Sequence, residues 1–167
     1  VAKLVPLAPH AIVQITTYSA SAAFVRAARK AVYGGQMINV SFVGTQALSQ
    51  TLGAEAEGVM VSQVMPSPFK NSVPMTRAYV DALRASGAED TANYSGLEGF
   101  FAAHVLTTAM RQAARNSATL DREALKAALK AMDGEPLDGF TLDFHSGQTR
   151  QRFVELSMLK SNGKVVA

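Results

Sequence analysis

The stretch from Gly58 to Phe69, GVMVSQVMPSPF, places the strongest constraint on how this chain can fold. Its first part is apolar and rich in β-branched residues, which predicts a buried strand at 58–65. Pro66 and Pro68 then end the strand, because a proline gives no N–H to a sheet and pushes the residue before it into an extended conformation. We therefore expect an extended crossover between two packed bodies at these prolines.

The composition is that of a globular chain. Of its 167 residues, 48% are hydrophobic and 17% charged, which favours a buried core over disorder. No apolar stretch reaches the roughly 18 uncharged residues that a membrane span needs, and the first residues lack a signal-peptide pattern. The chain begins without Met, which we interpret as a mature or trimmed product. Cysteine is absent, which excludes disulfides, cysteine–zinc sites and thiol nucleophiles.

The net charge of +3 does not by itself predict a nucleic-acid partner. Arg122, Lys126 and Lys130 recur at four-residue intervals, which is typical of the solvated face of a helix. Arg26 and Arg29 are placed in the same way on an earlier predicted helix, with no interleaved aromatic residues on which bases could stack. We expect no nucleic-acid partner.

The chain before the crossover alternates between strand and helix patterns. Apolar runs predict strands at 11–17, 38–43 and 58–65, with helices at 19–32 and 47–52 between them. This order is typical of an α/β fold with a parallel, doubly wound sheet and right-handed crossovers. Ligands of such sheets bind outside the carboxyl ends of the strands. The loops at Thr16–Ser19 and Thr45–Gln46 are therefore candidates for a site.

The chain after the crossover changes pattern twice. Helical periodicity predicts three helices, at 73–85, 95–115 and 120–132. The second has a capping-box spacing at Ser95–Glu98, and its apolar residues cover so much circumference that we expect burial on most sides. Alternating residues then predict strands at 140–144 and 154–158, and the Asn162–Gly163 turn predicts a C-terminal β-hairpin. Pro136–Gly139 is the expected second crossover.

The usual motifs of nucleotide, zinc and acyl-transfer sites are missing, since the sequence contains no GxxxxGK[ST], GxGxxG, HExxH or GxSxG. The three histidines do not have metal-ligand spacing, and we interpret His104 as a core or interface residue. Asp143 and His145, two residues apart on a predicted strand, can form a catalytic dyad or stabilise a turn. We expect no cofactor and no metal.

Tyr18 is an aromatic residue to which neither helical nor strand periodicity assigns a structural role. It lies in a predicted loop at the carboxyl end of a strand, beside the hydroxyls of Thr16, Thr17 and Ser19. Such a cluster can bind a small polar ligand. The alternative is that the hydroxyls cap the following helix.

Six segments, taken in order, resemble a known family. They resemble the C-terminal half of type I periplasmic binding proteins, the branched-chain amino acid (Leu/Ile/Val) receptor family of ABC transporters. The resemblance covers nearly the whole chain and is most specific around the Pro66–Pro68 segment and in the helix after Ser95. The six segments are IVQITTYSASAAFVRAARKA, SFVGTQAL, EGVMVSQVMPSPF, YSGLEGFFAAHVLTTAM, TLDREALKAAL and GFTLDFHSGQTRQRFVEL.

The resemblance implies a two-lobed receptor that closes on a solute and catalyses no reaction. It implies an α/β second-lobe segment at 1–66, a helical first-lobe segment at 67–136 and second-lobe strands at 137–167. The expected solute is like a branched-chain amino acid or is a carboxylate such as an aromatic acid. The expected protein partners are the membrane subunits of an ABC permease, with the receptor periplasmic or otherwise extracytoplasmic and lipid-anchored. The residues that match the family's second-lobe ligand loops are Thr17, Tyr18, Ser19, Thr45 and Gln46.

The sequence departs from the family in two respects. Amino acid receptors of the family often place an acidic residue where this chain has Gln46 or its neighbours, which argues against an α-amino acid ligand. The first-lobe sheet is missing, so we expect a fragment of a longer precursor whose exposed apolar faces pair by homodimerisation or segment exchange. Two alternative functions are a ligand-sensing domain of a receptor or regulator with the same fold, and an α/β enzyme that uses Asp143 and His145.

Overall fold

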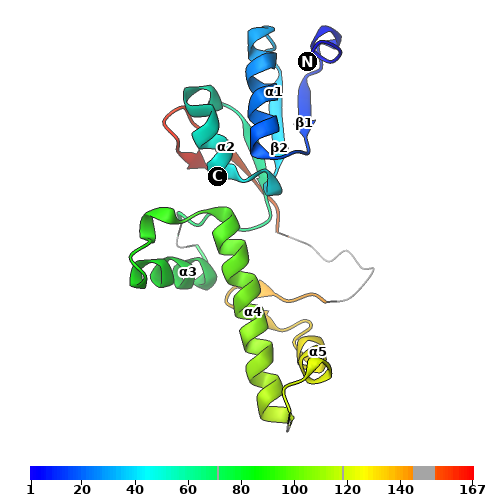
Figure 1. Ribbon diagram of the computed structural model, residues 1–167, viewed down its shortest axis with the longest axis vertical. Helices are drawn as coiled ribbons and strands as arrows, with labels where there is room; N and C mark the ends of the chain where they lie inside the picture. Colours follow the sequence, from blue (N-terminus) through cyan, green and yellow to red (C-terminus); the bar gives the residue numbers. More distant parts are fainter. Residues whose placement is uncertain (71, 118, 145–152) are drawn as a thin grey trace. The chain divides into compact units, whose positions relative to one another are not determined.

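The computed structural model describes residues 1–70, 72–117, 119–144 and 153–167. These residues form two compact units, each with its own core, along the chain traced in Figure 1. Unit 1 comprises Val1–Ser67, Asn93–Ser95 and Phe153–Ala167, and unit 2 comprises Pro68–Ala92 and Gly96–Arg152.

Unit 1 is built on a five-stranded mixed sheet with the order β1-β2-β3-β6-β7. The first three strands are parallel, and β6 pairs antiparallel to β3 and to β7. The expected fold class, a parallel α/β sheet with a C-terminal hairpin, is therefore confirmed. The bounds of the strands are β1 Ala11–Gln14, β2 Gln36–Val40, β3 Met60–Gln63, β6 Glu155–Leu159 and β7 Val165–Val166.

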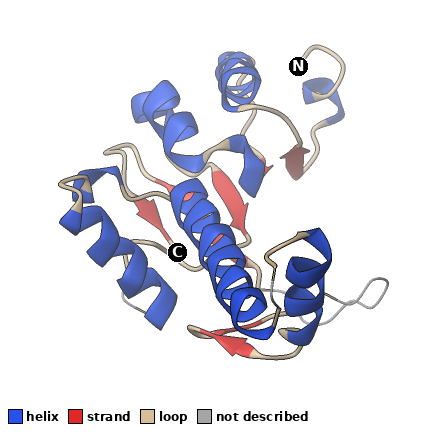
Figure 2. Ribbon diagram, turned by 60° about the horizontal axis from the view of Figure 1, so that its bottom comes forward, coloured by secondary structure: helices blue, strands red, loops and turns tan. Residues whose placement is uncertain are grey.

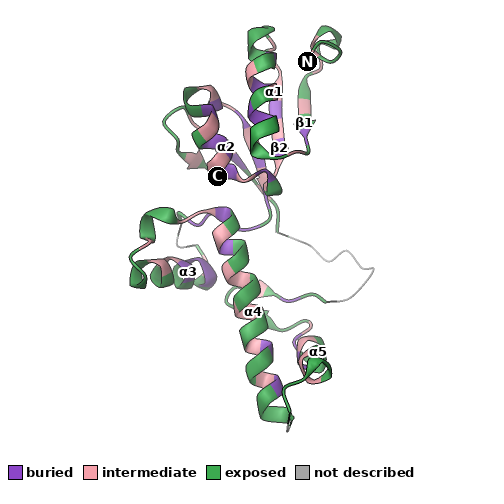
Figure 3. Ribbon diagram, in the orientation of Figure 1, coloured by how far each residue is buried: buried purple, intermediate pink, exposed green. Residues whose placement is uncertain are grey.

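Two helices connect the parallel strands and cover one face of the sheet. Helix α1 (Tyr18–Lys30) follows β1, and α2 (Thr45–Leu52) follows β2 after a 3-10 turn at Ser41–Val43. Every second strand residue turns toward these helices, so the core forms between the two layers, where Figure 3 shows buried segments on both. Among its residues, Val25, Leu48, Val59, Val61 and Leu159 are at most 1% exposed.

The opposite face of the same sheet is less covered. Val13 on β1 and Leu156 on β6 are 61% and 52% exposed. The expectation that this chain leaves apolar sheet surface uncovered is consistent with these exposures.

Unit 2 is helical. Helix α3 (Pro74–Ala85) begins with a proline in its first turn, and α5 (Arg122–Ala131) is capped by Asp121, whose carboxylate accepts from the Ala124 N–H. Helix α4 (Tyr94–Asn116) begins one residue before the expected capping box, at a short segment that belongs to unit 1.

The expectation that α4 is buried on most sides is wrong for this chain. Its buried stripe runs along one face, through Ala109 and Ala113, against α5 and a short hairpin. Leu106 and Met110, which made the sequence pattern so broad, are 44% and 38% exposed. The pattern counted every apolar residue, whereas burial requires a packing partner on each side.

The short hairpin corrects a second expectation. Strands β4 (Pro136–Leu137) and β5 (Phe140–Thr141) pair antiparallel around a two-residue turn, drawn red in Figure 2. The turn residues Asp138 and Gly139 both have positive φ, as a tight hairpin requires. Pro136–Gly139 is therefore a turn within unit 2 and not a crossover. Among the described residues, 136–144 group with the helices of unit 2.

Candidate functional site

The loop after β1 places three predicted site residues at the N-terminus of α1. Thr17 is the N-cap residue, and Tyr18 and Ser19 form the first helical positions. No side chain caps the helix, and the hydroxyls of Thr17 and Ser19 lie 3.4 Å apart. All three residues are exposed, with Tyr18 at 45%. The sequence allowed the loop hydroxyls either to bind a ligand or to cap the following helix. The structure does not show the capping role for the Thr17 hydroxyl.

The loop after β2 places the other two predicted residues in the first turn of α2. The two differ, because Thr45 is only 2% exposed whereas Gln46 is half-buried. The Thr45 hydroxyl accepts a hydrogen bond of 2.9 Å from the Gln63 amide. The Thr45 hydroxyl therefore forms its hydrogen bond in the interior of unit 1. The Gln46 Nε2 has no partner among the residues that the structure describes.

A buried polar row crosses the sheet near these loops. The Gln63 Nε2 also donates to the Ser157 hydroxyl at 2.7 Å, and this hydroxyl donates to the Val61 carbonyl at 3.2 Å. Tyr94, at the start of α4, belongs to the same region. Burial raises the pKa of Tyr94 and the charge of Glu155 adds to the rise, whereas hydrogen bonds to Ser67 and Ser157 lower it. Sequence reasoning missed this row, because it joins segments far apart in the chain.

Two further amides were also missed. Gln14 ends β1 and pairs in register with Asn39 of β2, so both side chains lie on the face covered by the helices. They are 7% and 0% exposed. The Asn39 Oδ1 accepts from Ser21 of α1 at 2.7 Å, but Asn39 Nδ2 and both polar atoms of Gln14 have no partner in the described part of the chain. A polar residue at the end of an apolar run was the signal available in the sequence.

The same edge of the sheet exposes large apolar side chains. Ile15 follows β1 and is 73% exposed, Phe42 follows β2 and is 62% exposed, and Val64 follows β3 and is 44% exposed. Together with Tyr18, each loop after a parallel strand therefore presents at least one large apolar side chain to solvent. Exposed apolar groups that cluster in this way are typical of binding surfaces.

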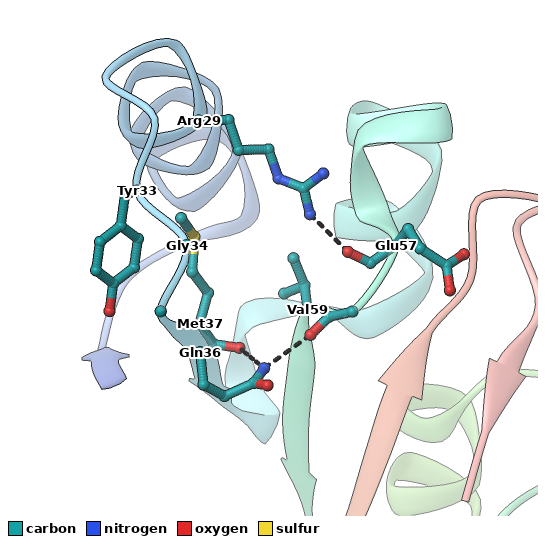
Figure 4. Close-up of a pocket in the computed structure, with 9 residues that line it drawn as sticks. Arg29, Tyr33, Gly34, Gln36, Met37, Glu57 and Val59 are labelled. Carbon is teal, nitrogen blue, oxygen red and sulfur yellow. Dashed lines mark hydrogen bonds between the residues drawn. The ribbon is translucent and has the colours of Figure 1, made fainter. Parts of the chain in front are cut away.

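A cavity of about 340 Å³ lies at the opposite, amino end of the strands and is shown in Figure 4. None of the five predicted site residues lines it. Its polar groups bind the backbone: Arg29 Nη2 donates to the Glu57 carbonyl at 2.5 Å, and Gln36 Nε2 donates to the Gly58 carbonyl at 2.7 Å. These bonds indicate a structural role, since they hold the starts of β2 and β3.

The histidine candidates lie in unit 2. His145 is outside the described residues, so the structure does not test its pairing with Asp143. His104 is half-buried and has two side-chain partners. Its Nε2 lies 3.0 Å from Asp138 Oδ2, and its ring stacks on Phe100. This arrangement joins α4 to the β4–β5 hairpin.

No group of three or more His, Cys, Asp or Glu side chains in the described ranges could hold a metal ion. No helix within those ranges has both the length and the apolar character needed to cross a membrane.

Solved structures with the same fold come from bacterial solute receptors. The chain is 26% identical to a possible leucine/isoleucine/valine-binding protein from Rhodopirellula baltica SH 1, with a TM-score of 0.82, 95% of this chain covered and 43% of that one. A substrate-binding periplasmic protein from Ralstonia solanacearum is 29% identical, with a TM-score of 0.79 over 99% of this chain and 49% of that one. A fatty acid ABC transporter substrate-binding protein from Thermomonospora curvata shares the fold at 18% identity, with a TM-score of 0.82 over 99% and 43%.

The chain thus spans less than half the length of these three structures. A search of curated protein sequences finds no match. The model of the periplasmic binding protein family matches residues 1–163, nearly the whole chain. The resemblance seen in the sequence is confirmed, and the chain belongs to the periplasmic binding protein family.

Proposed function

We propose that this chain is part of the extracytoplasmic solute-binding component of an ABC importer, and that it binds a small organic solute without chemical change. Its partners are the solute and the membrane subunits of the permease. Membership of the periplasmic binding protein family supports this proposal, as do neighbours whose names give leucine/isoleucine/valine or fatty acid binding. Unit 1 contributes the carboxyl-end edge of its sheet, where ligands of parallel α/β sheets bind.

The observation that carries the proposal is the state of the loop after β1. Thr17, Tyr18 and Ser19 are exposed together, and no side chain caps the helix that they begin. An uncapped helix N-terminus with two exposed hydroxyls and an exposed aromatic ring offers both hydrogen bonds and an apolar contact. We propose that these three residues, with Gln46, contact the solute, and that Thr45 positions the first turn of α2.

The test is a solute panel on the complete gene product. Thermal shift and calorimetry would be run with amino acids, aliphatic and aromatic carboxylates and sugars, because a ligand that binds only the folded state raises the melting temperature. At least one solute should bind with 1:1 stoichiometry. If no solute binds, the function proposed here is wrong.

A pair of variants locates the site. Tyr18→Ala should weaken binding of that solute by about tenfold or more, since exposed aromatic rings dominate small binding surfaces. Val32→Ala is the matched control, because Val32 is a large apolar residue, 89% exposed, just beyond the other end of α1. Equal affinities of the two variants would remove Tyr18 from the site.

A further inference from the structure

Unit 1 consists of three stretches of chain, and each contributes one buried hydroxyl near the point where it joins unit 2. The first stretch ends at Ser67, the second is Asn93–Ser95, and the third begins at Phe153. The hydroxyls belong to Ser67, to Tyr94 and to Ser157 on β6. These three residues are 4%, 4% and 0% exposed. We call them the connector hydroxyls, since they lie in or next to the segments that connect the units.

Tyr94 lies between the other two connector hydroxyls. Its own hydroxyl is within hydrogen-bonding reach of both Ser67 and Ser157, and its ring is buried at the first residue of α4. Burial raises the pKa of Tyr94, so the phenol stays protonated at neutral pH and keeps its O–H donor. A neutral phenol can donate to one serine and accept from the other. One side chain can therefore link all three stretches of unit 1.

The hydrogen bonds continue from the connector hydroxyls to the first turn of α2. The Ser157 hydroxyl accepts from Gln63 Nε2 at 2.7 Å, and the same Nε2 donates to the Thr45 hydroxyl at 2.9 Å. Thr45 begins α2, directly before Gln46. The three bonded residues are at most 2% exposed, so water does not compete for their hydrogen bonds. A buried polar path therefore runs from the start of α2 to the start of α4.

Tyr94 differs from the residues proposed to contact the solute. It is 4% exposed, whereas Tyr18 is 45% exposed. A side chain with so little accessible surface has almost no area with which to contact a solute. Any effect of the Tyr94 hydroxyl on solute binding must therefore act through the residues that it holds in place.

We propose that Tyr94 is a positioning residue for solute binding: its hydroxyl links the three connecting segments to the sheet of unit 1 and holds the first turn of α2 in its binding conformation. This inference rests on the function proposed above and adds to it a residue that does not contact the solute. Without the link, these segments sample more conformations. The apparent dissociation constant then rises in inverse proportion to the fraction of molecules that can bind.

Binding kinetics of the complete gene product test the proposal, with a solute identified by the panel above as the probe. Tyr94→Phe removes the hydroxyl and keeps the ring. In stopped-flow measurements it should slow association at least about fivefold and leave dissociation within about twofold, because molecules in the competent conformation bind as before. Tyr18→Ala, at a residue proposed to contact the solute, should mainly speed dissociation. Unchanged association in Tyr94→Phe, or a change confined to dissociation, overturns the proposal.

Tyr79→Phe is the matched control. Tyr79 lies on α3 in unit 2 and is 5% exposed, so both variants remove a phenol oxygen from an equally buried tyrosine. Both can lower the melting temperature. Tyr79→Phe should nevertheless leave the association rate within about twofold of the parent protein, because it does not touch the connector hydroxyls. Equal slowing by the two variants would show a general loss of stability and overturn the proposal.

Serine variants test whether Tyr94 acts through the other connector hydroxyls. Ser67→Ala and Ser157→Ala should each slow association, and adding Tyr94→Phe to the pair should slow it little further, because the same hydrogen bonds are already lost.

Fully additive effects would show that Tyr94 acts through other groups and would overturn the proposal. A solute that binds the parent protein and Tyr94→Phe at equal association rates rejects this inference and leaves the proposed function standing. A panel without any ligand rejects both.

Discussion

Unit 1 and unit 2 bury different kinds of side chains. The core of unit 1 combines branched aliphatic residues from two layers with polar side chains that bind one another, such as Gln63 and Ser157. The core of unit 2 between α4, α5 and the hairpin is built largely of alanines with Met132 and Leu142. The difference teaches that unit 1 packs large aliphatic and hydrogen-bonded polar side chains, whereas unit 2 packs small side chains between α4 and α5.

The largest expected effect is a core truncation in unit 1. Leu48→Ala should lower the free energy of unfolding by about 2–5 kcal/mol, because Leu48 is fully buried between α2 and the sheet. The matched change in unit 2, Leu129→Ala, should cost about 1 kcal/mol, because Leu129 is only partly buried. Urea unfolding with hydrogen exchange of amides in each unit measures both. Equal losses would remove the contrast between the units.

The second-largest expected loss of stability comes from the buried polar row. Gln63→Leu should cost about 1–3 kcal/mol, because it takes the donor away from the buried Thr45 and Ser157 hydroxyls. In unit 2, Thr76→Val removes the local bonds between Thr76 and Val73 at the start of α3 and should cost about 1 kcal/mol. Thermal or urea unfolding compares the two. If Gln63→Leu is neutral, the polar row does not stabilise unit 1.

Two glycines in tight turns differ in what surrounds them. Gly139→Ala in unit 2 should cost about 1–3 kcal/mol, because φ is +95° and a Cβ would lie 3.2 Å from Pro74 and Val73. Gly163→Ala in unit 1 should cost about 1 kcal/mol, since φ is +81° but no atom lies within 4 Å of the added Cβ. The difference between their unfolding free energies isolates the steric part. A larger cost at Gly163 would contradict this account.

The smallest effect is on the pH dependence of stability. Hydrogen bonds from the Ser161 N–H and the Lys160 ammonium lower the pKa of Glu57 in unit 1, and Arg84 lowers the pKa of Glu89 in unit 2. Because the folded pKa is lowered, the ionised carboxylate stabilises the native state above the ordinary pKa of 4.5. This stabilisation is lost as the pH falls through the folded pKa. Glu57→Gln and Glu89→Gln should each flatten the fall in urea midpoint between about pH 6 and pH 3. An unchanged slope in both variants would reject these pairings.

The sequence predicted the elements better than it predicted their partners. Strands β1 to β3 and helices α1 to α5 follow from period, caps and turn residues, which are local signals. The Asp138–Gly139 turn was also local evidence for a hairpin, but the alternation at 140–144 could not say which sheet its residues join. The burial of α4 was overestimated because periodicity reports apolar residues and not the surfaces that cover them.

The candidate site was predicted to a similar degree. The rule that ligands bind at strand carboxyl ends selected the loops that hold Tyr18 and Gln46. It could not distinguish the inward hydroxyl of Thr45 from the exposed one of Thr17, because that depends on Gln63, a residue of another strand. Unpartnered amides such as Gln14 become visible only when the atoms around them are known.

The pairing of β3 with β6 also sets the order in which the chain can fold. The hydrogen bond between Gln63 and Ser157 closes a loop of 94 residues. Contacts of such long range slow folding, because the entropy of the loop is lost before the strands pair. At about 5–20 residues per second of synthesis, roughly 5–20 seconds pass between the making of β3 and of β6. During that interval β3 is an open edge strand, so the nascent chain is most prone to aggregation before β6 is made.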